Sequence, residues 1–70
     1  MTMAELRNTL KDLRAQKGYT QASLAEEIGV SRKTINTIEN HVFTPSTLLA
    51  MQIARALDVT VHDIFYIKED

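Results

Sequence analysis

Apolar residues recur at every third or fourth position along most of the chain, as they do on one face of an α-helix. The first such set consists of Met3, Leu6, Leu10 and Leu13. Thr2 and Glu5 match a capping box at the start of this set, so we predict a first helix over about residues 3–16. Gly18 follows and ends this helix.

Two further helices are predicted by N-capping residues that precede short apolar stripes. Thr20 precedes a second helix over about residues 21–28, and Ser31 precedes a third helix that starts at Arg32 and ends near Asn40. Gly29 lies between the two helices and supplies a turn with positive φ. The inward-facing residues are Leu24, Ala25, Ile28, Ile35 and Ile38.

A fourth helix is predicted in the second half of the chain. Either Thr44 or Ser46 caps it, Pro45 suits its first turn, and Asp58 follows its end. Its apolar stripe consists of Leu49, Ile53 and Leu57.

A short fifth helix and a strand complete the predicted elements. Thr60 caps the helix over about residues 61–65. Asp63 lies in its first turn, where the helix dipole favours an acidic residue. Residues 65–68 favour a strand that is too short to be stable alone. This strand needs a partner, either the N-terminal arm or a second chain.

Composition limits the classes of protein that remain. The chain has 70 residues and no cysteine, which leaves one small domain over residues 1–70 and excludes disulfides and thiol catalysis. Its two histidines lie far apart, and it has no nucleophile elbow or Gly-rich phosphate loop, so we expect no metal, no cofactor and no enzyme. Short apolar runs and the lack of a signal peptide predict a cytoplasmic protein without membrane contact.

Charge is distributed unevenly although the formal net charge is only −1. Six basic residues against three acidic ones lie in residues 7–33, whereas four acidic residues against one lysine lie in residues 58–70. A nearly neutral chain can therefore present one surface that attracts anions.

The spacing of small and apolar residues between Gln21 and Asn40 predicts a helix-turn-helix over residues 21–40. Two short helices that cross closely need a small residue at the crossing, here Ala25, and a residue with positive φ in the turn, here Gly29. The apolar positions around these two residues fill the core between the helices.

The same residues carry a family resemblance. The matching segments are the run from Asn8 to Ile28 with Arg14, Lys17-Gly18-Tyr19-Thr20-Gln21 and Leu24-Ala25, then Val30-Ser31-Arg32, Ile35, Ile38-Glu39-Asn40, Pro45-Ser46 and residues 53–57. Here the chain resembles the phage-repressor and Cro-type (XRE family) helix-turn-helix transcription regulators, and is most similar to their small stand-alone bacterial members. The resemblance covers about residues 8–65 and implies an all-α, five-helix lambda-repressor-like domain, here with a short C-terminal β-strand.

The resemblance implies that the third helix enters the major groove of double-stranded DNA. With Ile35 and Ile38 facing inward, a helical wheel places the polar residues of this helix outward. We predict that its base-contacting residues are Arg32, Lys33, Asn36 and Thr37. The arginine and lysine suit guanine, the asparagine suits adenine or a phosphate, and the threonine suits a base or a thymine methyl group. Phosphate contacts alone are the alternative for Arg32 and Lys33.

Further residues have roles that the resemblance implies. Gln21, Ser31 and Asn40 are predicted to bind the phosphate backbone. The alternatives are a solvated residue at Gln21 and a helix C-cap at Asn40. Arg14 and Glu39 are predicted to form a partly buried ion pair between the first and third helices, with two separate solvated charges as the alternative.

Several positions depart from the resembling family. Many of its members carry a glycine and then a basic residue after Asn40, where this chain has His41 and Val42, and a glycine where this chain has Asp58. Leu48 is also unusual and is expected to be an exposed apolar contact.

The C-terminal residues predict self-association. The apolar residues Ile64, Phe65, Tyr66 and Ile67 exceed what one small core needs, so we predict a homodimer interface within about residues 60–70. The predicted function is that of a sequence-specific transcriptional regulator, a repressor that binds a palindromic operator as a homodimer. The alternative is an antitoxin whose main partner is a toxin protein and whose DNA binding is autoregulatory.

Overall fold

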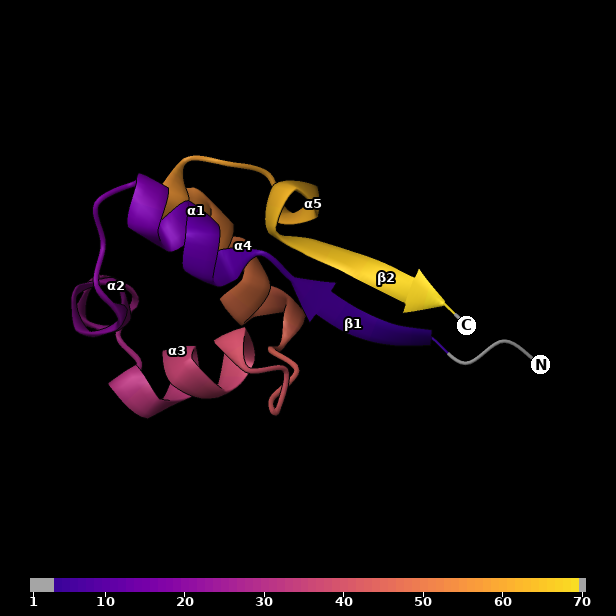
Figure 1. Cartoon of the computed structure of the whole chain (residues 1–70). Coiled ribbons are helices and arrows are strands. Elements are labelled where there is room, and N and C mark those ends of the chain that lie inside the picture. Colours follow the sequence, from indigo (N-terminus) through magenta and orange to yellow (C-terminus); the bar gives the residue numbers. More distant parts are fainter. Residues whose placement is uncertain (1–3, 70) are drawn as a thin grey trace.

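The computed structural model describes residues 4–69, which form five helices and two strands. In chain order these are β1 (Ala4–Asn8), α1 (Leu10–Gln16), α2 (Gln21–Ile28), α3 (Arg32–Glu39), α4 (Thr47–Leu57), α5 (Val61–Ile64) and β2 (Phe65–Glu69). The helices form one body, and the two strands extend from it as a ribbon toward both chain ends (Figure 1). Within residues 4–69, no helix combines the length and apolarity that a membrane crossing requires.

The prediction of a helix over residues 3–16 is wrong in its first part. The chain is extended over β1, and α1 begins only at Leu10. Asn8 marks the change because its side-chain Oδ1 accepts a hydrogen bond from the backbone N–H of Leu10 at 3.1 Å. The predicted capping box rests on Thr2, which lies outside the described residues, and on Glu5, which lies in β1.

The strand at residues 65–69 finds its partner in the N-terminal arm, the first of the two alternatives. β1 and β2 pair antiparallel, in a register that runs from Ala4 opposite Glu69 to Asn8 opposite Phe65. The fold is therefore mostly helical with a two-stranded sheet, and the expectation of an all-α domain is corrected by β1.

The other helices begin and end close to the predicted residues because their caps form as expected. Thr20, Ser31, Ser46 and Thr60 each accept a hydrogen bond from the backbone N–H three residues later. Ser46 rather than Thr44 caps α4, and Pro45 precedes this cap instead of lying in the first turn. In α5 the backbone N–H of Thr60 also donates to Asp63 Oδ2 at 2.8 Å, which holds the pKa of Asp63 below its ordinary value.

The core consists of ten buried side chains contributed by all five helices and the start of β2. These are Leu10, Leu24, Ala25, Ile35, Ile38, Ile53, Ala54, Leu57, Ile64 and Phe65. Ile64 and Phe65 are thus not available as surface residues for a dimer, because the domain needs them to close its own core. Of the four predicted interface residues, only Tyr66 and Ile67 are exposed.

Candidate nucleic-acid interface

The turn between α2 and α3 has the backbone geometry that its sequence requires. Gly29 has φ +78°, in the left-handed region that favours glycine. The backbone N–H of Val30 then donates to the carbonyl of Ala25 at 2.9 Å, and Ala25 itself is buried. These contacts join the end of α2 to the start of α3 and fix how α3 is presented.

The polar residues at the start of α3 lie together at the surface. Arg32, Lys33 and Asn36 are exposed, and with Gln21 from α2 they line a hollow of about 380 Å³. Four of the predicted DNA-contacting residues therefore share one site. Glu39 is the only acidic residue of α3, and it points into the network described next, so the exposed start of this helix is cationic.

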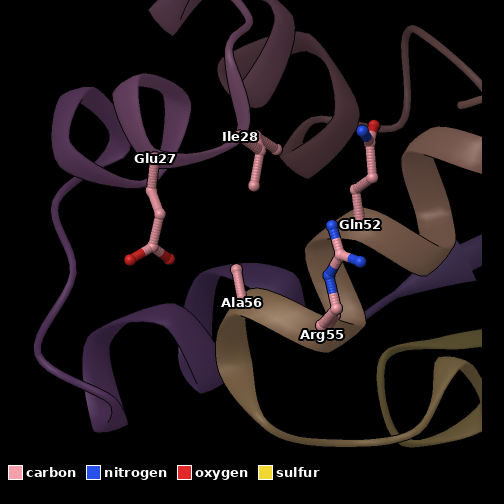
Figure 2. A pocket seen from close by; sticks show the side chains of 5 residues that line it. All are labelled: Glu27, Ile28, Gln52, Arg55 and Ala56. Atoms are coloured by element: carbon pink, nitrogen blue, oxygen red, sulfur yellow. The ribbon is translucent and has the colours of Figure 1, made fainter.

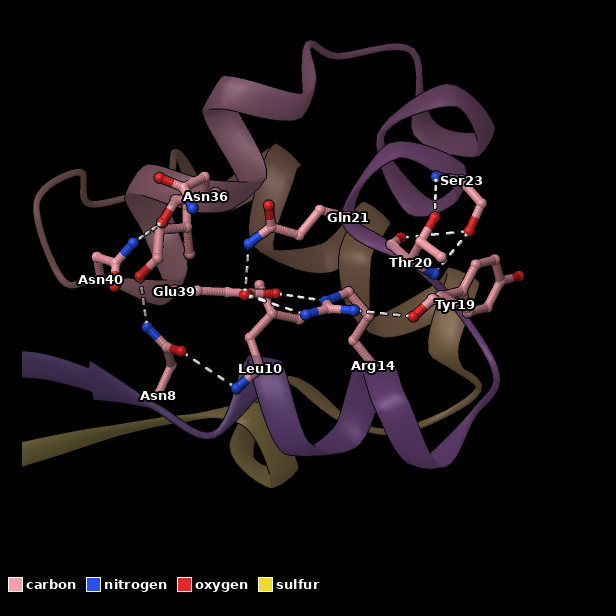
Figure 3. A network of polar contacts seen from close by, with 11 residues as sticks. Asn8, Leu10, Arg14, Tyr19, Thr20, Gln21, Ser23, Asn36, Glu39 and Asn40 are labelled. Atoms are coloured by element: carbon pink, nitrogen blue, oxygen red, sulfur yellow. Dashed lines mark hydrogen bonds and ion pairs between the residues drawn. The ribbon is translucent and has the colours of Figure 1, made fainter.

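Behind this surface, the predicted ion pair between α1 and α3 is present (Figure 3). Arg14 Nε donates to Glu39 Oε2 at 2.6 Å and Nη2 donates to Oε1 at 3.3 Å. Arg14 Nη1 also donates to the carbonyl of Tyr19 at 2.9 Å. The side chains of Arg14 and Glu39 are 13% and 3% exposed. A paired, nearly buried charge of this kind constrains orientation more than it adds stability, so it holds α3 against α1.

Gln21 belongs to the same network. Its Nε2 donates to Glu39 Oε1 at 2.9 Å, so one amide hydrogen is engaged inside the protein (Figure 3). This bond fixes which way the amide faces while the side chain still lines the hollow beside Arg32. Its contact with phosphate stays a prediction.

Thr37 differs from the other predicted base-contacting residues. It is half-buried, and its hydroxyl donates to the carbonyl of Thr34 at 3.0 Å. The hydroxyl proton is therefore used within α3, because a threonine in a helix can bond to the carbonyl of the preceding turn. Apolar contact through the methyl group remains open to this side chain.

Ser31 and Asn40 both form helix caps. Ser31 Oγ accepts from the backbone N–H of Thr34 at 3.1 Å. Asn40 Nδ2 donates to the carbonyl of Asn36 at 2.9 Å, which is the C-cap alternative for this residue (Figure 3). Both side chains are exposed, so a second role at phosphate stays a prediction.

Asn8 has a role that the sequence did not predict. Its Nδ2 donates to the carbonyl of Ile38 at 2.9 Å, so the last residue of β1, which already bonds to the first residue of α1, also holds the last turn of α3 (Figure 3). An asparagine two residues before a helix is a local signal for the first contact. Nothing local predicts the second contact, because Ile38 lies far along the chain.

The end of α3 is closed by a left-handed residue that is not glycine. His41 has φ +61°, and its backbone N–H donates to the carbonyl of Ile38 at 3.0 Å. The N–H groups of Val42 and Phe43 both donate to the carbonyl of Thr37, at 2.9 and 3.1 Å. This is the Schellman pattern of helix termination, and it folds residues 42 and 43 back toward α3.

Another hollow, of about 370 Å³, lies between α2 and α4 (Figure 2). Glu27 from α2 and Arg55 from α4 are among its lining residues. Tyr19 donates its hydroxyl to Glu27 Oε2 at 2.6 Å, and this bond raises the pKa of Tyr19. None of the predicted DNA-contacting residues lines this hollow.

Comparison with known proteins agrees with this geometry. A family model described as helix-turn-helix matches residues 10–64. The chain is 40% identical over 65 residues to the uncharacterized HTH-type transcriptional regulator YgzD of Bacillus subtilis (strain 168), covering 93% of this chain and 98% of that protein. It is 33% identical over 57 residues to antitoxin HipB of Escherichia coli O6:H1, covering 81% of this chain and 61% of HipB.

A solved structure is also similar. The crystal structure of a putative DNA-binding protein from Bacteroides fragilis superposes with a TM-score of 0.80 at 28% sequence identity. The match covers 87% of this chain and 98% of that one. The likeness therefore extends over nearly the whole fold.

Proposed function

We propose that this chain, which belongs to the helix-turn-helix family of DNA-binding transcriptional regulators, is a repressor. In this proposal it binds a palindromic operator as a homodimer. In this proposal α3 lies in the major groove, and the hollow lined by Gln21, Arg32, Lys33 and Asn36 faces the bases. Two copies related by a two-fold axis would place their α3 helices about 34 Å apart, one turn of DNA.

The observation that carries the proposal is the cationic, donor-rich start of α3. Arg32 and Lys33 are exposed and can each donate to guanine O6 and N7, while Asn36 can pair with adenine. Because the Glu39 carboxylate is engaged by Arg14 and Gln21, it does not neutralise this surface. The same ion pair fixes the helix, which is what a specific contact to base edges needs.

An apolar surface supports the dimer. Met51 of α4 and Leu6 of β1 line a groove of about 220 Å³, and Ile67 lies opposite Leu6 in the sheet. Met51 and Ile67 are 57% and 67% exposed. Leu48, also exposed as expected, lies beside Met51. Contiguous apolar surface of this kind is usual at interfaces between subunits.

Selection of bound duplexes from a random pool tests DNA recognition. We expect a palindrome with half-site centres about 10 base pairs apart. Arg32→Ala and Lys33→Ala should each reduce the preference for this site over a scrambled duplex by roughly 1–3 kcal/mol. Lys11→Ala is the matched control, because it removes one exposed cation from α1, outside both the hollow that Arg32 and Lys33 line and the predicted dimer interface. Equal losses on both duplexes would show that Arg32 and Lys33 bind only phosphate.

Sedimentation tests the dimer separately. Met51→Lys and Ile67→Lys should each shift the chain toward monomer, since a charge would be buried in the interface. Ala15→Lys adds the same charge at an exposed position of α1 and should leave sedimentation unchanged. A wild-type monomer at high micromolar concentration would contradict the dimer.

The second candidate function is that of an antitoxin, and the similarity to antitoxin HipB favours it. In that case a growth-inhibiting protein encoded beside this chain would form a stable complex with it. Co-expression of the two proteins should then restore growth. Failure of the purified pair to form a complex would leave the repressor as the proposed function.

A further inference from the structure

A hollow of about 310 Å³ lies along α3 next to the predicted base-contacting residues. It is lined by Ser31, Lys33, Thr34, Thr37, Val42 and Phe43. Lys33 also lines the hollow that contains Arg32 and Gln21, so the two hollows adjoin. Val42 and Phe43 belong to the loop after α3, and the sequence predicted no DNA contact for either residue.

The hydroxyl groups around this hollow are engaged within α3. Ser31 Oγ and Thr34 Oγ1 share a hydrogen bond at 2.9 Å, and Thr37 Oγ1 donates to the carbonyl of Thr34 at 3.0 Å. What the hollow offers a ligand is therefore the methyl groups of the two threonines and the apolar side chains of the loop. Its only charged lining residue is Lys33.

The apolar wall is held by the backbone. The carbonyl of Thr37 accepts hydrogen bonds from the N–H groups of both Val42 and Phe43, after the left-handed turn at His41. Val42 is nevertheless 78% exposed and Phe43 47% exposed. Two large apolar side chains are thus fixed at the surface beside a cationic helix, where the domain's own core does not use them.

The ligand chemistry follows from this combination. A partner that approaches Arg32 and Lys33 carries negative charge, and an apolar hollow beside them also needs an apolar group on the same partner. In the major groove of DNA that group is the C5-methyl of thymine, which projects from the base edge beside the hydrogen-bonding atoms. The lack of an acidic lining residue fits a polyanionic partner.

We propose that the hollow formed by Thr34, Thr37, Val42 and Phe43 binds thymine methyl groups and so selects thymine at one or two positions of each half-site. The proposal rests on the proposed function, since it requires α3 to lie in the major groove. It assigns Val42 and Phe43 as specificity-determining residues that act by apolar contact. Burial of one methyl group is worth about 0.8 kcal/mol, or about a fourfold change in affinity.

The experiment removes the methyl group from the DNA and leaves the protein unchanged. The probe is the duplex enriched from the random pool, synthesised with thymine or with deoxyuridine at one position at a time. Uracil keeps the hydrogen-bonding atoms of thymine and lacks only its methyl group. We expect about a fourfold loss of affinity at one or two positions per half-site and no loss at the other thymines.

Protein variants then assign the effect to this hollow. In Val42→Ala and Phe43→Ala, the ratio of thymine to deoxyuridine affinity at the sensitive positions should fall toward one. Gln16→Ala is the control, because it truncates an exposed side chain at the end of α1 that lines neither this hollow nor the apolar surface assigned to the dimer, and its ratio should match the wild type. Both wall residues are exposed enough that their truncation leaves the core intact.

Four results would overturn the proposal, and only the last of them also overturns the proposed function. If wild-type protein binds the enriched duplex equally well with either base, DNA recognition stands and the methyl contact is wrong. If deoxyuridine lowers the affinity of Val42→Ala and Phe43→Ala as much as it lowers the affinity of the wild type, the methyl group is bound elsewhere. If these variants bind DNA normally but dissociate into monomers, the hollow holds a second copy. If no duplex is enriched, the proposed function fails and this inference fails with it.

Discussion

Replacing Arg14 with methionine removes one charge of the buried ion pair while keeping much of the apolar stem of the side chain. The carboxylate of Glu39, 3% exposed, would then keep only the bond from Gln21. Removing one partner of such a pair costs more than the pair contributes, because the remaining charge has lost its water without compensation. Arg14→Met should therefore destabilise the fold strongly.

The magnitude follows from the bonds that are lost. Arg14 makes two hydrogen bonds to Glu39, at 2.6 and 3.3 Å, and one to the carbonyl of Tyr19 at 2.9 Å. Hydrogen bonds to charged groups are worth about 1.5–3 kcal/mol each, and loss of one buried partner costs about 3–5 kcal/mol in all. Small domains are stable by roughly 0.05–0.15 kcal/mol per residue. The variant should thus lose about half of its free energy of unfolding or more.

Urea denaturation followed by far-ultraviolet circular dichroism measures this free energy. The series comprises Arg14→Met, Glu39→Leu and the double variant, with Lys11→Met as the control on the exposed side of α1. The double variant leaves no unpaired charge, so it should be more stable than either single variant. The control should change stability by less than about 0.5 kcal/mol.

Two results would refute this reasoning. If Arg14→Met costs no more than the Lys11→Met control, the ion pair does not hold α1 to α3 in solution. If the loss in the double variant equals the sum of the two single losses, the charges act independently and the contact between them carries no energy.

Three further perturbations test other parts of the structure. Since α3 presents Arg32 and Lys33, affinity for any duplex should fall as salt rises from about 50 to 200 mM, and a flat titration would contradict a cationic DNA-binding face. The hydrogen bonds from Thr60 favour the carboxylate of Asp63, so this group stabilises the folded state fully above its ordinary pKa of 3.8 and less as the pH falls through the lowered folded pKa. The difference in unfolding free energy between wild type and Asp63→Ala should therefore narrow below pH 3.8, whereas a constant difference would contradict the cap. Asp58 has φ +57°, in the left-handed region. Asp58→Gly should raise the free energy of unfolding by about 0.5 kcal/mol, because relief of left-handed strain outweighs the added freedom of the unfolded chain. Thermal denaturation measures this change, and a lower free energy of unfolding in the variant would contradict the expectation.

The helices that follow an N-cap were predictable because their signals are local. Thr20 and Ser31 each satisfy an N–H three residues later, so the start of α2 and of α3 depends on neighbouring residues only. The direction in which α3 presents Arg32 and Lys33 follows from the inward positions of Ile35 and Ile38. This part of the candidate site needed no knowledge of the rest of the chain.

The N-terminal strand was not predictable in the same way. Leu6 fits a helical spacing with Leu10, and it fits a strand equally well. Too few apolar residues surround it to distinguish a helical period from the period of a strand. Pairing with β2 settles the choice, and that partner lies at the other end of the sequence. The same closure buries Phe65, which the sequence alone presented as a surplus apolar residue.

Side-chain partners within the site were predicted least well. Thr37 and Gln21 each have a polar group that can bond to solvent, to DNA or to the protein, and the choice depends on how the helices pack. The structure shows both bonded internally, to Thr34 and to Glu39. The apolar wall formed by Val42 and Phe43 depends on the left-handed turn at His41. The sequence does not predict this turn, because the position holds a histidine and not a glycine.

The pairing of β1 with β2 also constrains how this domain is made. Synthesis proceeds from the N-terminus, so residues 4–8 leave the ribosome long before residues 65–69 exist to pair with them. Until then the backbone N–H and C=O groups of β1 that bond to β2 have no partner strand, and Ile64 and Phe65 are missing from the core. The nascent chain can form its helices one by one, yet the domain closes only after β2 has emerged from the ribosome.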